Sequence, residues 1–534
     1  MSGRLLSKIR DLTKSITIYG LGDVAVSIVS FFLLGVYVYY LDATDYGVIA
    51  MLGSGEVIAK IVFRFGLDGS FMRFYYDCED ERARQRLAST IFLFLLGLNG
   101  AVLVALLAGS WWLAGSVLGS TAYTRALQLM LLNTFAIGFT FIPFHVLRME
   151  QRSITFSSLT LVRSVLTIVL RLVFVMSFGL GVTGLYLADV IVTAVVLILL
   201  VPWFAPLIRL VFSGSTLRES LRFGVPRVPH AAAQQVMAVG DKFILKLFTS
   251  LDNIGIYNLA VSFGLTQKLF LSAFESAWAP FYYSTVREAD AERVFRTVTT
   301  YGVAVLALLT AGLSAVGADA AAAMTHGRIL APDDPRWSAV STVVTWTAIG
   351  VFLQGFYLLT SIGLNITKRT EYYPIATVTA AATNVVLNFL LIPRYGIVGA
   401  AWANGACYAV QAVLGYTFSQ RFYSVAYEWG RMLRICASAA IATAAARMLP
   451  HIQLPGAGTR SALASLPDVA TRGLAVIVVY GILLAATGFF HAEEIAFLRR
   501  LQLKGRRPTT LYYYRELQNL RDPIHFRGMA KGSR

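Results

Sequence analysis

The sequence predicts an all-α protein that crosses a lipid membrane about fourteen times, and composition, the length of apolar runs and an internal repeat lead to this prediction. Of the 534 residues, 57% are apolar and only 14% are charged, which is too little polar surface to cover soluble domains of this size. The apolar residues form runs of roughly 18 to 26, long enough to cross a hydrocarbon core of about 30 Å as helices. Because a backbone in lipid must satisfy its own hydrogen bonds, each run is predicted to be helical.

The predicted spans follow one another through most of the chain. They begin near Ile16, Tyr46, Leu87, Ala126, Phe156, Val182, Val225, Ile256, Thr299, Val340, Pro374, Ile397, Met432 and Leu474. Most of the 46 Lys and Arg residues fall on alternate connections and on the segment after Phe490, and such residues favour the cytoplasmic side of a membrane. Both termini are therefore predicted to be cytoplasmic, and the net charge of +17 reflects topology rather than binding of nucleic acid.

An internal repeat divides the chain into two similar halves. Residues 181–189 (GVTGLYLAD) and 396–404 (GIVGAAWAN), at the starts of the sixth and twelfth predicted spans, share two glycines and an alanine followed by Asp or Asn. Weaker matches pair residues 19–20 with 223–224 and residues 41–42 with 251–252. Duplicated halves are common in transporters. The alternative is that the glycines recur only because small residues let membrane helices pack closely.

The repeat predicts two six-helix bundles related by a pseudo-two-fold axis along the membrane normal, because an even number of spans leaves the two copies parallel. The predicted boundaries are a cytoplasmic N-terminus at residues 1–15, the N-terminal bundle at 16–208 and the C-terminal bundle at 209–421. Two additional transmembrane helices follow at 422–490, and a basic cytoplasmic tail at 491–534. The basic tail is expected to lie on anionic headgroups.

Charged side chains within the spans are the first candidates for function, because they are costly in lipid. In the second span Glu56, Lys60, Arg64 and Asp68 follow one another at four-residue intervals and therefore share one helix face. That face is predicted to line a wet cavity or to meet neighbouring helices rather than lipid. The alternative is that Glu56 with Lys60, and Arg64 with Asp68, only neutralise each other.

Other predicted spans carry further charged residues. The candidates for substrate binding are Lys60, Arg64, Arg163, Arg171 and Lys268, and those for binding a coupling ion are Asp23, Glu56 and Asp241. The unpaired Arg163 and Arg171 on the fifth span favour a cationic cavity for an anionic, phosphate-bearing substrate. Lys242 and Lys246 are expected to extend to the outer surface.

Two prolines mark the start of the seventh span. Pro226 and Pro229 each remove a backbone donor, which predicts a kink or an unwound start that bends during gating. The alternative is that they are ordinary prolines of a first helical turn. His230 beside them is expected to be a packed residue rather than a proton carrier.

Signatures of catalysis are missing from the sequence. It contains no Gly-Lys pair for a phosphate-binding loop, no His-Glu-x-x-His and no Asp-x-Asp pair. We therefore expect a protein that is not an enzyme, with no metal and no cofactor. A membrane glycan polymerase or ligase would need a substantial outer loop, and the longest candidates, near residues 317–337 and 450–471, are short and poor in paired acids.

Several motifs resemble the polysaccharide and lipid-linked oligosaccharide flippases, the Wzx-type proteins of the MATE-like (MOP) transporter superfamily. They are residues 221–230 (LRFGVPRVPH), 239–245 (VGDKFIL) and 253–257 (NIGIY), with 45–47 (DYG), 65–69 (FGLDG) and 396–404 in support. The resemblance covers the first twelve spans. It implies two bundles that open alternately to either face and move an undecaprenyl-diphosphate-linked glycan outwards. It also implies that cavity cations meet the diphosphate or acidic sugars, at positions such as Lys60, Arg64, Arg163 and Arg171. Lys242 departs from the arginine expected after Asp241.

The sequence thus favours a transporter that flips a lipid-linked oligosaccharide in a bacterial cytoplasmic membrane, for synthesis of a surface polysaccharide. Coupling to an ion gradient is expected, because no nucleotide site is present. Membrane lipids, a polysaccharide polymerase and glycosyltransferases are the expected partners. The alternative within transport is a MATE-type multidrug exporter, whose cavity would favour acids over bases because its substrates are often cations.

Overall fold

The computed structural model describes residues 33, 35–150, 152–286, 290–330, 334–450 and 462–490, and every regular element among them is a helix. The principal helices are α2 (Ala43–Arg64), α3 (Leu67–Tyr75), α4 (Glu81–Ala108), α6 (Thr124–Ile137), α7 (Phe141–Met149), α8 (Ser153–Leu172), α9 (Gly181–Phe204), α10 (Gly214–Gly224), α11 (Val228–Phe248), α12 (Leu251–Gly264), α13 (Gln267–Thr285), α14 (Ala291–Met324), α15 (Trp337–Thr360), α16 (Ile362–Ile366), α17 (Tyr372–Phe422), α18 (Trp429–Arg447) and α19 (Ala462–Ala486). The all-α prediction is confirmed.

Nine helical segments of the described residues are long and apolar enough to cross a membrane. The prediction of a multi-pass membrane protein is therefore confirmed. Helices occur at each predicted run from the one near Tyr46 onwards, whereas the run near Ile16 lies almost entirely outside the described residues. The total of fourteen spans stays a prediction.

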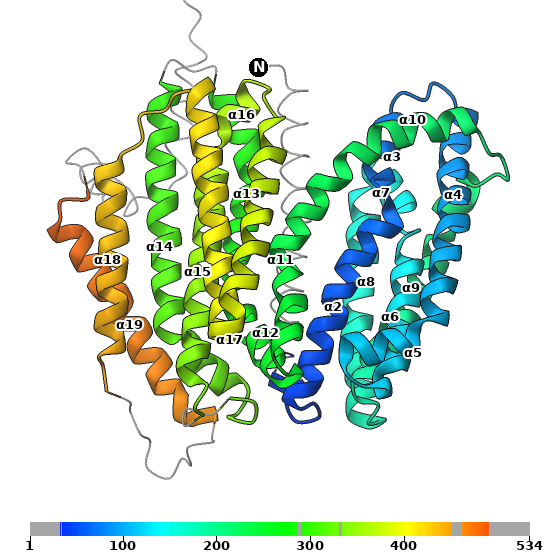
Figure 1. Ribbon diagram of the computed structural model, residues 1–534. Coiled ribbons are helices and arrows are strands. Elements are labelled where there is room, and N and C mark those ends of the chain that lie inside the picture. Colours follow the sequence, from blue (N-terminus) through cyan, green and yellow to red (C-terminus); the bar gives the residue numbers. More distant parts are fainter. Residues whose placement is uncertain are drawn as a thin grey trace, which may run out of the picture. The chain divides into compact units, whose positions relative to one another are not determined.

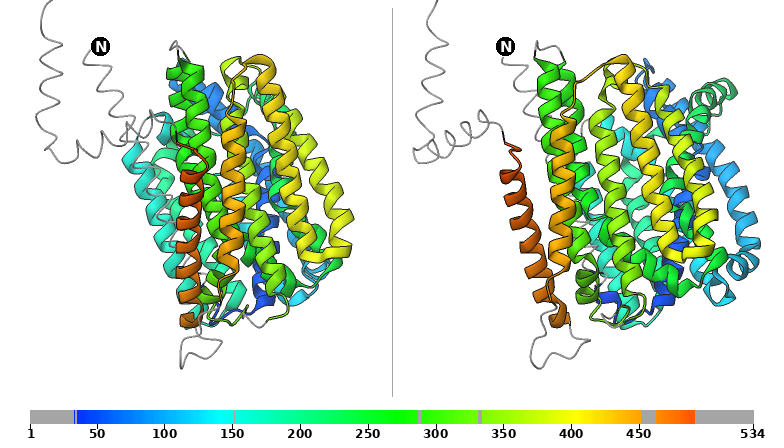
Figure 2. Two further views of the ribbon diagram at one scale, coloured as in Figure 1. Left: turned by 90° about the vertical axis from the view of Figure 1, so that its left-hand side faces the viewer. Right: turned by 60° about the vertical axis from the view of Figure 1, so that its left-hand side comes forward.

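The helices gather in two groups (Figures 1 and 2). Helices α4, α6, α8 and α9 pack together with α2, while α14, α15, α17 and α18 pack together with α11 and α12. Contacts of α2 with α11 and α12 join the groups. By its contacts the chain divides into residues 1–480, which hold all of these helices, and residues 481–534, which hold the end of α19. The domain boundaries expected from the sequence stay predictions.

The repeated glycines are required by backbone geometry as well as by packing. Gly181 and Gly396, which open the two copies of the motif, both adopt left-handed φ values, 52° and 55°. A straight helix with the length of α17 would measure about 75 Å, more than twice the hydrocarbon core. Helix α17 instead bends at Gly396, and the parts on either side of the bend correspond to two predicted spans. At Gly184 and Gly399 an added Cβ would lie 3.2 and 2.5 Å from a backbone carbonyl oxygen.

The two halves meet in a symmetric crossing of α2 and α12. A Cβ added to Gly47 would lie 2.0 Å from the carbonyl oxygen of Leu251, and one added to Gly255 would lie 2.0 Å from that of Ala43. Each glycine thus faces the first residue of the partner helix, as a two-fold relation requires. The predicted pairing of residues 41–42 with 251–252 was wrong by two positions, because Asp42 and Ser250 are the N-caps of the two helices.

Replacement of Gly255 by Ala is expected to lower the stability of the folded protein by at least 1–3 kcal/mol, roughly the cost of overpacking, because the backbones would have to separate. Thermal unfolding of the detergent-solubilised protein measures this effect. Gly53→Ala is the matched control, since a Cβ at Gly53 of α2 would meet nothing within 4 Å. Equal melting temperatures for the two variants would contradict a close crossing at Gly255.

The last helices attach to α14. Helix α18 packs along α14, and the guanidinium of Arg447 donates to the carbonyl oxygen of Ser314 at 2.7 Å. In α19, Arg472 forms a buried ion pair with Asp319 of α14 at 2.8 Å, and the Tyr480 hydroxyl donates to the carbonyl oxygen of Ala304 at 2.9 Å. The two additional predicted spans therefore pack against the second group of helices.

Candidate functional site

A cavity of about 560 Å³ lies between the charged face of α2 and the start of α11. Its lining comprises Val57, Lys60, Ile61, Arg64, Gly66, Asp68, Gly69, Arg227, Val228, His230, Ala231 and Gln235. We call it the cationic cavity, because three permanently charged cations face a single carboxylate. The structure places Lys60, Arg64 and Asp68 around this cavity, but Asp68 lies on α3 rather than on the face of α2 that the predicted stripe required. It also adds Arg227, which the sequence analysis did not assign.

The local backbone explains how this cavity forms. Helix α2 ends at Phe65, which has a left-handed φ of 50°, and Gly66 follows with φ of 71°. Because two successive left-handed residues interrupt the helix, Asp68 lies in the first turn of a separate helix, α3. On the opposite wall, the 3₁₀ turn Val225–Arg227 joins α10 to α11 and places Pro226 and Pro229 in the first turns of their helices. The start of the seventh span is thus interrupted, and the prolines also occupy ordinary first-turn positions.

The charged stripe on α2 is partly neutralised. Lys60 lies 2.6 Å from Glu56, and Arg64 lies 3.8 Å from Asp68. The side chains of Lys60 and Arg64 are each 35% exposed, so both can still reach a ligand in the cavity. Within the described part of the chain, the buried Nε of Arg64 has no hydrogen-bond partner. Mutual pairing therefore accounts for the stripe only in part.

The two arginines of the fifth span behave differently. Arg171 is paired, contrary to the prediction: its Nε and Nη2 donate to the two carboxylate oxygens of Asp189 at 2.9 and 2.6 Å. This fork-to-fork geometry neutralises it within the bundle. Arg163 forms no ion pair among the described residues. Its positive charge is attracted by the carboxylates of Asp189 and Glu56 and repelled by Arg64 and Arg171. Arg163 is half-buried and is not among the residues that line the cationic cavity.

A buried carboxylate lies in the second group of helices. Asp241 of α11 is only 2% exposed and accepts hydrogen bonds from the Tyr257 hydroxyl and from the Lys242 backbone N–H at 2.8 Å, and the Asn404 side chain lies nearby. No Lys or Arg side-chain nitrogen lies within 4.0 Å of the Asp241 carboxylate among the described residues. Asn404 is the repeat counterpart of Asp189. In the first half this position pairs with Arg171, whereas in the second half it lies near the carboxylate of Asp241.

The remaining predicted site residues are more dispersed. Lys268 lies on α13, two turns before Glu275 on the same face, and lines none of the cavities described here. Glu56 forms an ion pair with Lys60. Asp23 lies outside the described residues. Lys246 approaches Gly119, at the end of the chain's third predicted span, as expected for a side chain that extends to the outer surface.

A second cavity of about 670 Å³ adjoins the first. It is lined by Pro226, Arg227, His230, Gln234, Glu275, Trp278, Ala279, Tyr282, Tyr357, Leu358, Ser361, Asn365, Thr370, Glu371, Tyr373 and Pro374. We call it the aromatic cavity. Sequence reasoning missed it, although the four-residue spacing of Trp278 with Tyr282, and of Tyr357 with Ser361 and Asn365, marked two polar-aromatic helix faces.

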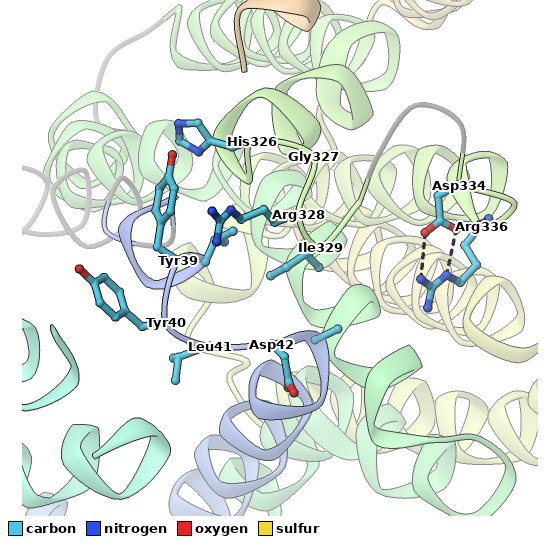
Figure 3. A pocket seen from close by; sticks show the side chains of 12 residues that line it. Tyr39, Tyr40, Leu41, Asp42, His326, Gly327, Arg328, Ile329, Asp334 and Arg336 are labelled. Atoms are coloured by element: carbon cyan, nitrogen blue, oxygen red, sulfur yellow. Dashed lines mark hydrogen bonds and ion pairs between the residues drawn. The ribbon is translucent and has the colours of Figure 1, made fainter. Parts of the chain in front are cut away.

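A third cavity, of about 910 Å³, lies at the predicted outer end, where α2 begins and α14 ends (Figure 3). The guanidinium of Arg328 lies 4.4 Å from the ring centre of Tyr39, and the His326 ring lies 5.0 Å from it. Arg336 forms ion pairs with Asp252 and, at 2.9 Å, with Asp334. Its side-chain hydrogen bonds lower the pKa of Asp334, so this ion pair persists at physiological pH. These contacts fasten the start of the first half to the α14–α15 connection of the second.

Removal of the Arg328 side chain is expected to loosen this end, because a cation–π contact of about 0.5–1 kcal/mol is lost. In a variant lacking the three cysteines, Tyr40→Cys should react roughly 2–5 times faster with a membrane-impermeant thiol reagent after Arg328→Ala. Arg394→Ala is the control, because Arg394 is exposed near the same end and forms no ion pair among the described residues. An unchanged rate would show that the contact with Tyr39 does not hold this end closed.

The fold and its cavities define a polytopic helical membrane protein with a cationic chamber between two related groups of helices. The chain belongs to the family of polysaccharide biosynthesis proteins, which its residues 12–285 match. A probable flippase, AglR of Haloferax volcanii, is 29% identical over 186 residues, which cover 32% of this chain and 37% of that protein. The match therefore spans little more than a third of this relative.

Solved structures with the same fold are transporters of two kinds. The lipid II flippase MurJ in an inward closed conformation has a TM-score of 0.62 at 15% identity, over 87% of this chain and 99% of MurJ. An inward-facing multidrug resistance MATE family transporter of the MOP superfamily has a TM-score of 0.59 at 16% identity, over 79% of this chain and 96% of its own. The predicted MATE-like fold is thereby confirmed.

Proposed function

We propose that this chain is a flippase that moves a polyprenyl-diphosphate-linked oligosaccharide from the inner to the outer leaflet, for synthesis of a surface polysaccharide. The cationic cavity carries the proposal. Two arginines and a lysine facing one carboxylate suit a diphosphate, which accepts charge-assisted hydrogen bonds from several donors. The family assignment and the flippase names of AglR and MurJ support the same substrate class.

Alternating access is the proposed mode of transport, and the way the helices are joined supports it. The close crossing at Gly47 and Gly255 keeps the α2–α12 contact tight near the predicted outer end, while the cationic cavity lies beyond the middle of α2. Transport would open the outer end and close the inner one. The interrupted start of α11 at Pro226 and Pro229 is the proposed hinge, because a 3₁₀ turn between two helices absorbs bending more easily than a continuous helix.

Asp241 is the proposed site of ion coupling. Asp241 is buried and forms no side-chain ion pair among the described residues, whereas Glu56 is paired with Lys60. Asp23, the third candidate, lies outside the described residues. Arg163 and Lys268 are proposed to add positive potential along the path of the diphosphate. Arg171 is proposed to contribute only through Asp189, which holds it.

Replacement of Asp241 by Asn is expected to abolish the acceleration of transport by a proton or sodium gradient, because a neutral amide cannot bind or release a cation. Flipping in proteoliposomes should fall to the rate measured without a gradient, with glycolipid binding retained. Asp77→Asn, at an exposed carboxylate paired with Arg73, is the control. Persistence of the gradient effect in Asp241→Asn would exclude this residue as the coupling site.

A multidrug exporter is the second candidate function, because the fold also matches MATE transporters. Its cationic substrates would meet cationic side chains in the cavity, which opposes binding. Membrane localisation in a bacterial cytoplasmic membrane with both termini inside, and cooperation with glycosyltransferases and a polymerase, belong to the proposal.

The deciding experiment reconstitutes the full chain into liposomes with a fluorescent polyprenyl-diphosphate oligosaccharide. A membrane-impermeant oxidant of sugars then reports how much glycan reaches the outer leaflet. We expect exposure of the glycan to depend on the protein and to be absent from liposomes that lack it. Transport of cationic dyes without any movement of the glycolipid would reject the flippase proposal in favour of a multidrug exporter.

A further inference from the structure

The aromatic cavity is continuous in its lining with the cationic cavity. Arg227 and His230 line both, one at the junction of α10 with α11 and the other in the first turn of α11. A ligand whose diphosphate lies against Lys60 and Arg64 would therefore extend into the aromatic cavity with the group attached to that diphosphate. In the proposed substrate this group is the first sugar.

The lining of the aromatic cavity differs in chemistry from that of the cationic one. Rings and neutral polar groups from α13, α15 and α17 predominate, and Arg227 at the shared boundary is the one permanent cation among the lining residues. Sugars present C–H faces that stack on aromatic rings and hydroxyls that exchange hydrogen bonds with amides and carboxylates. A pocket of several hundred Å³ with rings and a few convergent polar groups is typical of small-molecule sites.

Hydrogen bonds hold several of these groups in position before a ligand arrives. The Tyr373 hydroxyl donates to the carbonyl oxygen of Ser361 at 3.1 Å, and the Asn365 side chain lies close to Tyr282 and Tyr373. Trp278 packs against neighbouring rings, with 5.2 Å to Phe274 between ring centres. Rings fixed in this way lose little conformational entropy on binding.

Two buried polar atoms in this lining lack partners among the described residues. They are the indole Nε1 of Trp278, a side chain that is 3% exposed, and Nδ1 of His230. A buried polar atom without a partner costs about 1–3 kcal/mol, so such groups are usually satisfied by water or a ligand. A sugar hydroxyl or an N-acetyl oxygen would supply the acceptor that the Trp278 N–H lacks.

The charge of the cavity indicates which sugars it accepts. Glu275 lines it, is exposed and forms no ion pair within 4.0 Å in the described part of the chain. Glu371 also lines it and is paired with Arg369 outside the cavity at 3.5 Å. A free carboxylate repels a uronic acid and accepts hydrogen bonds from hydroxyl, amide or ammonium groups.

We propose that the aromatic cavity is the subsite for the sugar attached to the diphosphate, and that Glu275 restricts this sugar to a neutral or amine-bearing one, excluding a uronic acid. This inference rests on the proposed function and specifies its substrate. It also assigns different parts of one ligand to the two cavities: the diphosphate to the cationic one and the sugar to the aromatic one.

The test compares four soluble probes on the purified full-length protein in lipid nanodiscs by calorimetry. They are inorganic pyrophosphate, a short prenyl diphosphate, its N-acetylhexosamine derivative and its hexuronic acid derivative. We expect the N-acetylhexosamine to raise affinity at least about tenfold over prenyl diphosphate, and the uronic acid to give no gain. Trp278→Phe, which keeps the ring and removes the N–H, should remove most of the gain without changing pyrophosphate binding.

Glu275→Gln is the variant that separates specificity from structure. It should raise affinity for the uronic acid derivative about tenfold and so remove the discrimination between the two sugar derivatives, which a merely structural glutamate would not do. Equal binding of both sugars by the unmodified protein, or no effect of Glu275→Gln on the uronic acid, would overturn the inference while pyrophosphate binding keeps the flippase proposal intact. Loss of binding of all four probes would instead reject the proposed function.

Discussion

Replacement of Arg227 by Ala is expected to lower the rate of glycolipid flipping roughly 10- to 100-fold, the equivalent of one or two charge-assisted hydrogen bonds to a diphosphate. Arg227 lines both adjoining cavities, whereas the charges of Lys60 and Arg64 are shared with Glu56 and Asp68. It is also the arginine of the cationic cavity with no carboxylate within 4.0 Å among the described residues. The liposome assay described above measures the effect.

The control for this prediction is Arg73→Ala on α3. Arg73 is more exposed than Arg64, forms an ion pair with Asp77 at 2.7 Å and lines none of the cavities described here. Its loss should leave flipping within about twofold of the unmodified protein, the range expected for a surface ion pair. Arg227→Lys should recover only part of the activity, because an ammonium cannot bind a phosphate bidentately. If Arg227→Ala flipped the glycolipid at the normal rate, the cationic cavity would not lie on the transport path.

The membrane-spanning fold could be predicted because it depends on local quantities. The length of an apolar run and the helical period are properties of short stretches of sequence, and the helices from Tyr46 onwards follow them. The repeat was predictable for a similar reason: Gly181 and Gly396 both need a left-handed backbone at the same turn. The pairing of residues 41–42 with 251–252 rested on identical residue types. In the structure the corresponding positions are the N-cap residues of α2 and α12, Asp42 and Ser250.

Only the relations between site residues on the same helix could be predicted from the sequence. The four-residue spacing of Glu56, Lys60 and Arg64 places them on one face, and the structure keeps them there. The partner of Arg171 could not be found in this way. Asp189 lies on the next helix, and the rotation of one helix relative to the other depends on the π-helical turn Val173–Ser177 and the left-handed Gly181 between them.

Side chains from different helices form the parts of the site that the sequence did not reveal. Arg227 lay within a proline-rich motif whose prolines suggested only a hinge, and no periodic face included it. The aromatic cavity joins α11, α13, α15 and α17, so its composition depends on which faces meet. Asp241 was a candidate from its position in a span, but its hydrogen bond from Tyr257 depends on the tertiary packing of α11 against α12.

Breaking the ion pair between Asp319 and Arg472 is expected to destabilise the packing of α19 on α14 by about 3–5 kcal/mol, because either single substitution removes one partner of a buried, hydrogen-bonded pair of charges. Asp319 is 3% and Arg472 is 7% exposed, and their side chains approach to 2.8 Å. Asp319→Leu should therefore lower the melting temperature of the solubilised protein markedly. The exposed pair of Arg369 and Glu371 is the control, since the loss of a surface ion pair costs about 0–1 kcal/mol.

The double variant Asp319→Leu with Arg472→Met distinguishes charge from packing. A buried ion pair replaced as a whole by apolar side chains of similar size often changes stability little, because desolvation of the two charges offsets their attraction. We therefore expect the double variant to melt close to the unmodified protein and well above either single variant. If the double variant were as unstable as Asp319→Leu alone, the ion pair would be more than an anchor, and its charges would be required where α14, α18 and α19 meet. Arg447 would then be the next residue to replace, because it donates to Ser314 on the same helix as Asp319.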